Sequence, residues 1–224
     1  MGGAPEQWRK DDDASNPRPD PRISGGVIAL NRRRKEGSRE RLLAAAAVAL
    51  CEHGYFGVSV EDIASAAGVS RMTFYRHFSG KAAVAAELFH INTGSAMPLL
   101  LSITQSDFRD PVIIRDWIAA LFASDRASRQ LLRVFTQASV SEPSFTATAH
   151  GFIDGLIIGL GRAIPAFALA PDHAPDRRRW IEAWLLLYEI LDQSNHAALD
   201  SGVATDPLTV DILAERFLAF TQAG

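Results

Sequence analysis

A short segment, residues 70–81, carries the side chains whose type and spacing best suit binding to a polyanion. Within it Phe74 and Phe78 are four residues apart, so a helix would turn both rings toward a core. The outer face of that helix would be Arg71, Met72, Thr73, Tyr75 and Arg76. An arginine there can form two hydrogen bonds with guanine, and methyl-bearing side chains can contact thymine methyl groups. The segment therefore predicts a helix that enters the major groove of DNA.

Other groups near this helix suit contacts with the DNA backbone. Tyr75 and Lys81 would reach phosphates, and the free amides at a helix that starts after Ser70 also suit an anion. The alternative is an ordinary helical hairpin with a basic surface. The coincidence of helix caps, a glycine turn and an outward aromatic side chain favours the DNA-binding interpretation.

The elements that position this helix have clear local signals. Ser38 is placed to cap a first helix, which ends at Gly54. Ser59 and Asp62 form a capping pair that opens a second helix. Gly68 allows a left-handed turn, and Ser70 caps the third helix. The pattern predicts a helix-turn-helix domain at residues 37–85.

The first 36 residues show no helical or strand period and are rich in proline and glycine, which predicts disorder. This segment ends in a basic run, Arg32, Arg33, Arg34 and Lys35. Two interpretations stay open for the run. It is either a solvated linker or an arm that follows phosphates or enters a minor groove.

Residues 38–88 resemble the DNA-binding domain of the TetR family of transcriptional regulators. The segments that carry the resemblance are Gly54-Tyr55, Ser59–Ala64, Ala67–Ser70, Thr73–Phe78 and Lys81. The resemblance implies a homodimer with two helix-turn-helix heads and a C-terminal body that senses a ligand. It implies phosphate contacts from Ser59, Tyr75 and Lys81 and base contacts from Arg71, Met72 and Thr73. His77 also matches a frequent residue of the family and is a lower-ranked DNA-binding candidate, for which we expect mainly a packing role.

Charge is distributed unevenly along the 224 residues. Residues 31–81 hold nine Lys and Arg against five Asp and Glu, a net +4, whereas residues 82–224 hold ten against sixteen, a net −6. A cationic module joined to an anionic one is typical of a DNA-binding domain attached to a domain with another task.

Helical spacing of apolar residues continues through the rest of the chain. The further predicted helices are residues 81–104, 111–123, 126–140, 144–163, 177–199 and 207–220, with a proline-rich loop at 164–176. The fold class is therefore all-α, with about nine helices: a three-helix head and a ligand-binding and dimerisation domain at residues 86–224.

Candidate sites in this second domain rest on side-chain type alone. The candidates for a ligand pocket, mostly apolar with a few polar groups, are Phe122, Phe135, Gln137, His150, Phe152, Leu156, Trp184 and Asp192. The candidates for a dimer interface are Trp180, Leu187, Leu191, Leu208, Ile212, Phe217 and Phe220. Both sets fit an ordinary core as well.

Other classes of protein lack support in the sequence. The six histidines show no metal-ligand spacing, and no phosphate-binding glycine loop or nucleophile elbow occurs, so we expect no metal, no cofactor and no catalysis. No apolar run approaches the roughly 20 residues that a membrane span needs. One cysteine, Cys51, suits a reducing cytoplasm.

The sequence therefore predicts a cytoplasmic, homodimeric regulator, most often a repressor, that leaves a palindromic DNA operator when an unknown small-molecule effector binds. The alternative is a DNA-binding regulator whose C-terminal domain docks a protein partner.

Overall fold

The computed structural model describes residues 37–223, and all regular elements in that range are helical. The α-helices are α2 (Ser38–His53), α3 (Val60–Ala66), α4 (Arg71–His77), α5 (Lys81–Leu101), α6 (Pro111–Ala127), α7 (Arg129–Ser141), α8 (Pro143–Gly161), α9 (Arg177–Ala198) and α10 (Leu208–Gln222). Four short 3-10 helices are η1 (Ser102–Gln105), η2 (Pro165–Phe167), η3 (Ala174–Asp176) and η4 (Gly202–Thr205). For these residues the all-α prediction is confirmed. The basic run at 32–35 lies outside the described residues.

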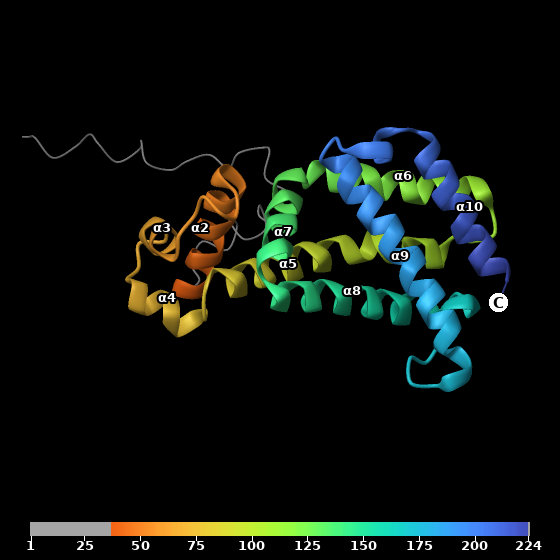
Figure 1. Ribbon diagram of the computed structural model, residues 1–224, viewed down its shortest axis with the longest axis horizontal. Helices are drawn as coiled ribbons and strands as arrows, with labels where there is room; N and C mark the ends of the chain where they lie inside the picture. The colour runs from red at the N-terminus through yellow and green to blue at the C-terminus, as the bar shows by residue number, and fades with distance from the viewer. Residues whose placement is uncertain (1–36, 224) are drawn as a thin grey trace, which may run out of the picture.

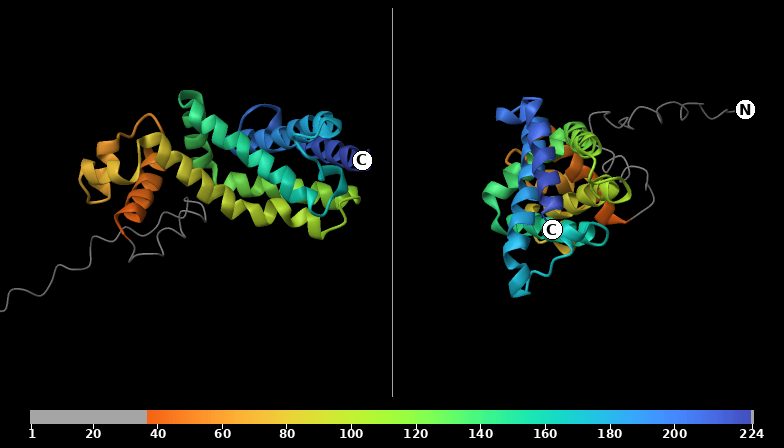
Figure 2. Two further views of the ribbon diagram at one scale, coloured as in Figure 1. Left: turned by 90° about the horizontal axis from the view of Figure 1, so that it is seen from below. Right: turned by 90° about the vertical axis from the view of Figure 1, so that its right-hand side faces the viewer.

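The helices form two parts that α5 connects. Helices α2, α3 and α4, hereafter the head, lie together at one end of the molecule, and α6 to α10 form the body at the other end (Figure 1). Helix α5 begins in the head and runs along the body beside α8. The left view of Figure 2 shows the same elongated arrangement from below, and the right view shows the molecule end-on from the side of the body.

The local signals in the head produce the structure that the sequence predicts. The Ser59 side chain accepts a hydrogen bond from Asp62 N, and the Asp62 carboxylate accepts one from Ser59 N, so the capping box is complete. Gly54 and Gly68 have φ values of 75° and 62°, which a side chain would strain. Ser70 Oγ accepts a hydrogen bond from Thr73 N and so caps α4. Local hydrogen bonds thus fix where α3 and α4 begin.

One cap prediction was wrong. Ser38 is the first residue of α2, Gly37 is at the cap position, and no side chain caps this helix. The Ser38 hydroxyl instead lies 2.6 Å from His77 Nε2 at the end of α4. The nearby histidine thus gives the hydroxyl a partner in another helix.

Two groups of buried side chains form the cores. The head core takes the inner faces of α2, α3 and α4 and the first half of α5, and it continues into α7 through Leu131, Val134 and Phe135. The body core takes side chains from the end of α5 and from α6, α8, α9 and α10. The head is therefore closed on one side by α7, a helix of the body. The domain boundary predicted near residue 85 falls within α5 and stays a prediction.

Helix ends in the body differ from the predicted ones by a few residues. Helix α6 continues to Ala127, past the predicted end at residue 123, and α7 begins at Arg129 rather than at 126. Residues 123–129 contain no glycine or proline, so no local signal marks the end of α6. The segment 164–176, predicted as a loop, contains η2 and η3. In this segment Phe167 is fully buried, and the centroid of its ring lies 4.7 Å from the centroid of the Phe220 ring.

Candidate nucleic-acid interface and ligand cavity

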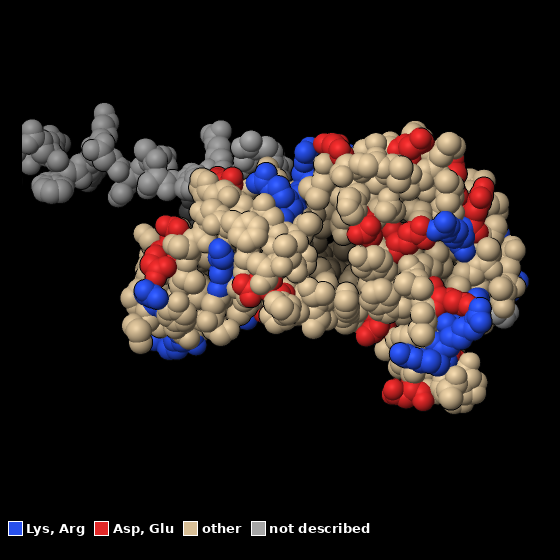
Figure 3. Space-filling view, in the orientation of Figure 1, with Lys and Arg blue, Asp and Glu red and all other residues tan. Residues whose placement is uncertain are grey.

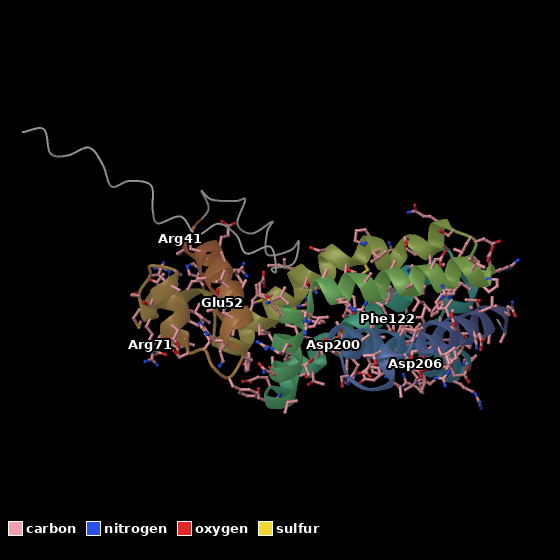
Figure 4. All side chains as sticks on the ribbon, turned by 90° about the horizontal axis from the view of Figure 1, so that it is seen from above. Arg41, Glu52, Arg71, Phe122, Asp200 and Asp206 are labelled. Atoms are coloured by element: carbon pink, nitrogen blue, oxygen red, sulfur yellow. The ribbon has the colours of Figure 1, made fainter. Side chains whose placement is uncertain are left out.

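Helix α4 presents the side chains that the sequence assigned to DNA bases. Phe74 and Phe78 are 0% and 5% exposed, so they anchor the helix in the head core as predicted. On the opposite face Met72 is 77% exposed and Tyr75 is 42% exposed. Arg71 lies at the outer end of the head (Figure 4), and basic atoms gather along this edge of the head over α4 (Figure 3). This face of α4 is therefore accessible for insertion into a DNA groove.

Arg71 has two contacts within the head. Its guanidinium forms an ion pair with Glu61 of α3, with a distance of 2.7 Å between Nη1 and Oε1. It also lies 5.5 Å from the centre of the Tyr75 ring. Both the Arg71 and the Glu61 side chains are more than half exposed, so the ion pair is weak and can be exchanged for a DNA contact. The pair keeps the guanidinium near α4 without burying it.

Ser59, Ser70 and Thr73 lie at helix starts and are engaged locally. Ser59 Oγ donates to the Asp62 carboxylate at 2.6 Å, and this bond is the main cause that lowers the pKa of Asp62. The Ser70 and Thr73 hydroxyls lie 3.0 Å apart. All three residues are exposed or partly exposed. Their predicted contacts with DNA stay predictions, and such contacts would have to share hydroxyls that already form hydrogen bonds within the head.

Lys81 has a structural task that the sequence did not indicate. Its Nζ donates hydrogen bonds to the carbonyl oxygens of Tyr55 and Val58, the latter at 2.7 Å. It also lies 4.3 Å from the centre of the Tyr55 ring, and burial lowers the pKa of Lys81. The first residue of α5 thus holds the loop between α2 and α3. A phosphate contact by Lys81 would have to share or replace these bonds.

The other predicted DNA residues differ in exposure. Arg76 is exposed on α4, which fits the prediction of an outward side chain. His77 is partly buried and lies 2.6 Å from the Ser38 hydroxyl, a contact within the head; a DNA contact by His77 stays a prediction.

A second junction joins the head to the body through Tyr55. Its backbone N–H donates to Gln137 Oε1 of α7 at 2.7 Å, and its hydroxyl donates to Glu142 Oε1 at 3.1 Å. Burial, with the neighbouring Glu142 carboxylate, raises the pKa of Tyr55 to about 12, so the hydroxyl keeps its proton. The structure therefore corrects the assignment of Gln137 to a ligand pocket. No local pattern could have paired residues that lie 82 apart in the sequence.

The body contains a cavity of about 160 Å³ between α5, α6, α8 and α9, to which α7 contributes Leu132. Three predicted pocket residues, His150, Phe152 and Asp192, line it. The other five candidates do not line it: Phe122, Phe135, Gln137, Leu156 and Trp184. Phe122 and Leu156 are buried in the body core and Phe135 in the head core, while Trp184 stacks on Tyr188 at a groove between α8 and α9. Figure 4 shows Phe122 within the body.

Asp125 of α6 also lines this cavity, although it was not among the candidates predicted from the sequence. Ser194 Oγ of α9 donates to its Oδ2 at 2.5 Å, and Ser194 itself is fully buried. Burial raises the pKa of Asp125 to about 6. Among the described residues no Lys, Arg or His forms an ion pair with this carboxylate. The charge therefore reduces stability at neutral pH.

We expect Asp125→Asn to raise the free energy of unfolding by about 1–3 kcal/mol at pH 7.5, because the substitution removes the unpaired charge. The upper limit follows from the shifted pKa of Asp125, since each pH unit by which a pKa is shifted corresponds to about 1.36 kcal/mol. The folded pKa, about 6, lies above the ordinary value of 3.8. Protonation therefore stabilises the folded chain at low pH, and this advantage is lost as the pH rises from about 4 to about 6. The measurement is urea unfolding of both proteins at pH 4 and pH 7.5. The gain should shrink toward zero at pH 4, and an equal gain at both values would contradict the argument.

The predicted dimer residues divide into three groups. Trp180, Leu187, Phe217 and Phe220 are 0–8% exposed, so their assignment to an interface is corrected: they fill the body core. Leu191 is partly buried and lines the cavity. Leu208 and Ile212 of α10 are exposed, at 63% and 48%.

Exposed apolar side chains that the sequence did not select lie on the outer side of α9. Ile181, Leu185 and Tyr188 follow one another at spacings of four and three residues and are 43%, 57% and 43% exposed. Ile158 of α8 lies across a groove from Ile181 and Leu185 and is 51% exposed. These four residues are hereafter the α8–α9 face. A cluster of exposed apolar side chains on neighbouring helices is typical of an interaction surface.

Sites for other chemistry are not prominent. Among residues 37–223 no three His, Cys, Asp or Glu side chains lie close enough together to hold a metal ion. Burial raises the pKa of the Cys51 thiol to about 11, so it is protonated at neutral pH. Among residues 37–223 no helix combines the length with the hydrophobic composition of a membrane span.

The sequence model for "Bacterial regulatory proteins, tetR family" matches residues 42–88, from α2 to the first part of α5. These residues form a TetR-family domain. The resemblance noted in the sequence is thus confirmed where it is specific. No curated protein matches the chain.

Solved structures show that the similarity in fold extends beyond the head into the body. A protein from Mesorhizobium loti that is described as a TetR-family transcriptional regulator has a TM-score of 0.55 at 19% identity, covering 81% of this chain and 95% of that one. The fatty acid degradation regulator FadR from Bacillus halodurans has a TM-score of 0.54 at 18% identity, covering 80% and 95%. A transcriptional regulator from Rhodococcus sp. Rha1 has a TM-score of 0.52 at 22% identity, covering 84% and 97%. The body therefore shares the fold of TetR-type regulators.

Proposed function

We propose that this chain is a DNA-binding transcriptional regulator, a cytoplasmic homodimer that represses transcription until a small molecule releases it from a palindromic operator. The observation that carries the proposal is α4: two buried phenylalanines anchor it, and its opposite face exposes Arg71, Met72 and Tyr75. This is the arrangement of a recognition helix in a helix-turn-helix protein. The match to the TetR family over the same residues supports it.

The α8–α9 face supports the homodimer. A head reads only one half-site, so a palindromic operator needs two heads at a fixed distance. Apolar side chains at one side of α9 are suited to pack against their symmetry copies, because a two-fold interface brings the same patch of both chains together. Leu208 and Ile212 on α10 extend the apolar surface available to a second copy.

The cavity supports a small-molecule effector, and α5 connects it to the head. Phe89 of α5 lines the cavity with Phe152, and their ring centroids are 6.0 Å apart. Phe89 also packs edge-on against Phe135, at 5.4 Å, within the head core. Eight residues before Phe89, Lys81 holds the α2–α3 loop. A molecule that binds one arrangement of α5 more tightly than another would shift the position of the head.

A body that docks a protein partner is the second candidate. An absence of any cavity between α6, α8 and α9 would have favoured it, and a cavity is present there. We therefore place the small-molecule effector first.

Selection of bound DNA from a random pool tests the proposal. The full chain should enrich a palindrome whose half-sites lie about 10 base pairs, or a small multiple, apart. Recovery of unrelated sequences only, in dilute buffer, would contradict the proposal.

Arg71→Ala should weaken binding to the selected operator by about 1–3 kcal/mol and relax the preference at one base position, since an arginine that forms two hydrogen bonds with guanine contributes about this much. The measurement is fluorescence anisotropy with operators that vary at each position. Arg115→Ala is the matched control, because Arg115 is an exposed arginine in an ion pair with Asp211 on the body. An unchanged base preference in Arg71→Ala would remove Arg71 from the readout.

A further inference from the structure

The charged side chains that line the cavity are all acidic. Among the residues that line it, Asp125 and Asp192 are acidic and none is Lys or Arg. The remaining polar lining groups are neutral amides and hydroxyls, together with His150. Most of the surface is apolar and includes Phe89 and Phe152. An occupant with a negative charge would meet carboxylates and no cation, whereas a positive charge would find a partner.

Asp125 is the group most in need of such a partner. Its carboxylate lies between α6 and α9, and the Ser194 hydroxyl is its single hydrogen-bond partner among the described residues. Asp125 is partly buried, and a carboxylate with reduced access to water is costly unless it is paired, a cost of which one hydroxyl offsets little. A bound cation would supply the missing charge.

The size of the cavity limits what can carry that cation. A dry cavity of about 150 Å³ lined by apolar side chains binds benzene, and the cavity here is about 160 Å³. An occupant with one aromatic ring and a short arm matches this volume. Phe89, Phe152 and Leu121 would surround the ring, and the arm would reach Asp125.

We propose that the cavity binds a small primary amine as its ammonium ion, with one apolar group of about the size of a benzene ring, and that Asp125 is the residue that selects its charge. This inference rests on the proposed function, since it names the chemical class of the effector. The ammonium would donate to Asp125, and Ser194 would hold the carboxylate in place. Asp125 thus reduces the stability of the empty protein and gains its counter-charge in the complex.

Three probes of nearly equal shape test the selection of charge: 2-phenylethylamine, 2-phenylethanol and phenylacetate. Isothermal titration calorimetry on the full chain at pH 7.5 should give an affinity for the amine at least about tenfold above the affinity for the alcohol. A tenfold ratio corresponds to a difference in binding free energy of roughly 1.4 kcal/mol. Phenylacetate should bind most weakly. Asp125→Asn keeps the shape of the side chain and an acceptor for the Ser194 hydroxyl. In this variant the affinity for the amine should fall to the affinity for the alcohol. Asp116→Asn, an exposed carboxylate on the same helix, is the matched control and should change nothing.

The pH dependence gives a second readout. The amine stays protonated across the range, while Asp125 loses its charge below about pH 6. Amine affinity should therefore fall as the pH is lowered from 7.5 to 5, and affinity for the alcohol should stay constant. His150 of α8 and Asp192 and Tyr188 of α9 are the other titratable groups of the lining; from α5 and α7 the lining takes none. If the pH dependence persisted in Asp125→Asn, one of them would be responsible and the assignment to Asp125 would be overturned.

Other results would also overturn the inference. These are equal affinity for amine and alcohol, preference for the carboxylate, no binding of any probe, or a preference for the amine that Asp125→Asn retains. The selection of bound DNA tests the proposed function independently of the amine titration. Failure of the amine test with operator binding intact removes this inference alone, whereas success of the amine test without operator binding removes the proposed function.

Discussion

Leu185→Asp is expected to convert the proposed homodimer to a monomer and to lower operator affinity by at least about a hundredfold, since two linked heads bind about 10²–10⁴ times more tightly than one. Leu185 is the most exposed apolar residue of the α8–α9 face within α9, at 57%. In a two-fold dimer the substitution places two carboxylates in one apolar interface, where neither has a cation. Sedimentation velocity measures the first effect, and operator titration measures the second.

Val140→Asp is the matched control for this prediction. Val140 lies near the end of α7, outside the α8–α9 face, and is 82% exposed. The same change of charge should leave both the mass in solution and operator affinity as they are. A dimeric Leu185→Asp protein with full operator affinity would place the interface elsewhere, and Leu208→Asp would then test the exposed start of α10.

The second large effect is expected from Phe74→Ala, which should reduce the free energy of unfolding by about 3–5 kcal/mol. The Phe74 ring is 0% exposed and lies 5.5 Å from the Tyr75 ring and 5.8 Å from the Phe78 ring. Alanine leaves a cavity at the only helix whose outer face is assigned to DNA bases, so specific DNA binding should be lost together with stability. Urea unfolding and operator titration measure the two losses.

Phe56→Ala controls for the loss of an aromatic ring from the head. Phe56 is 65% exposed, so this variant should stay within about 0.5 kcal/mol of the parent. A Phe74→Ala protein that loses less than about 1 kcal/mol would show that α4 is not anchored by this ring.

Much of the head could be predicted from the sequence because its signals are local. Ser59 with Asp62, the glycine at position 68 and Ser70 each act within a few residues, and each forms the expected cap or turn. The spacing of Phe74 and Phe78 likewise determines which face of α4 is outward. Lys81 shows the limit, because its partners in the α2–α3 loop are set by the tertiary fold.

The candidate sites of the body were harder to predict because α9 has apolar residues on two sides. Trp180 and Leu187 point into the core, whereas Ile181, Leu185 and Tyr188 point outward. Periodicity marks both groups and does not say which one the other helices cover. Asp125 was missed for a related reason: a charged residue near the end of a helix is ordinarily solvated, and only the packing of α6 on α9 reveals that it lies in the cavity.

The packing of the head on the body has a consequence for how the protein could change shape. The chain enters the body through α5, Tyr55 is held by Gln137 and Glu142 on the α7 side, and buried side chains of α7 complete the head core. A reorientation of the head therefore has to carry α7 with it or open a closely packed core, and the second course is costly. A rearrangement of α5 near Phe89, which contacts Phe135 of α7, is thus expected to displace α7 and the reading helix together.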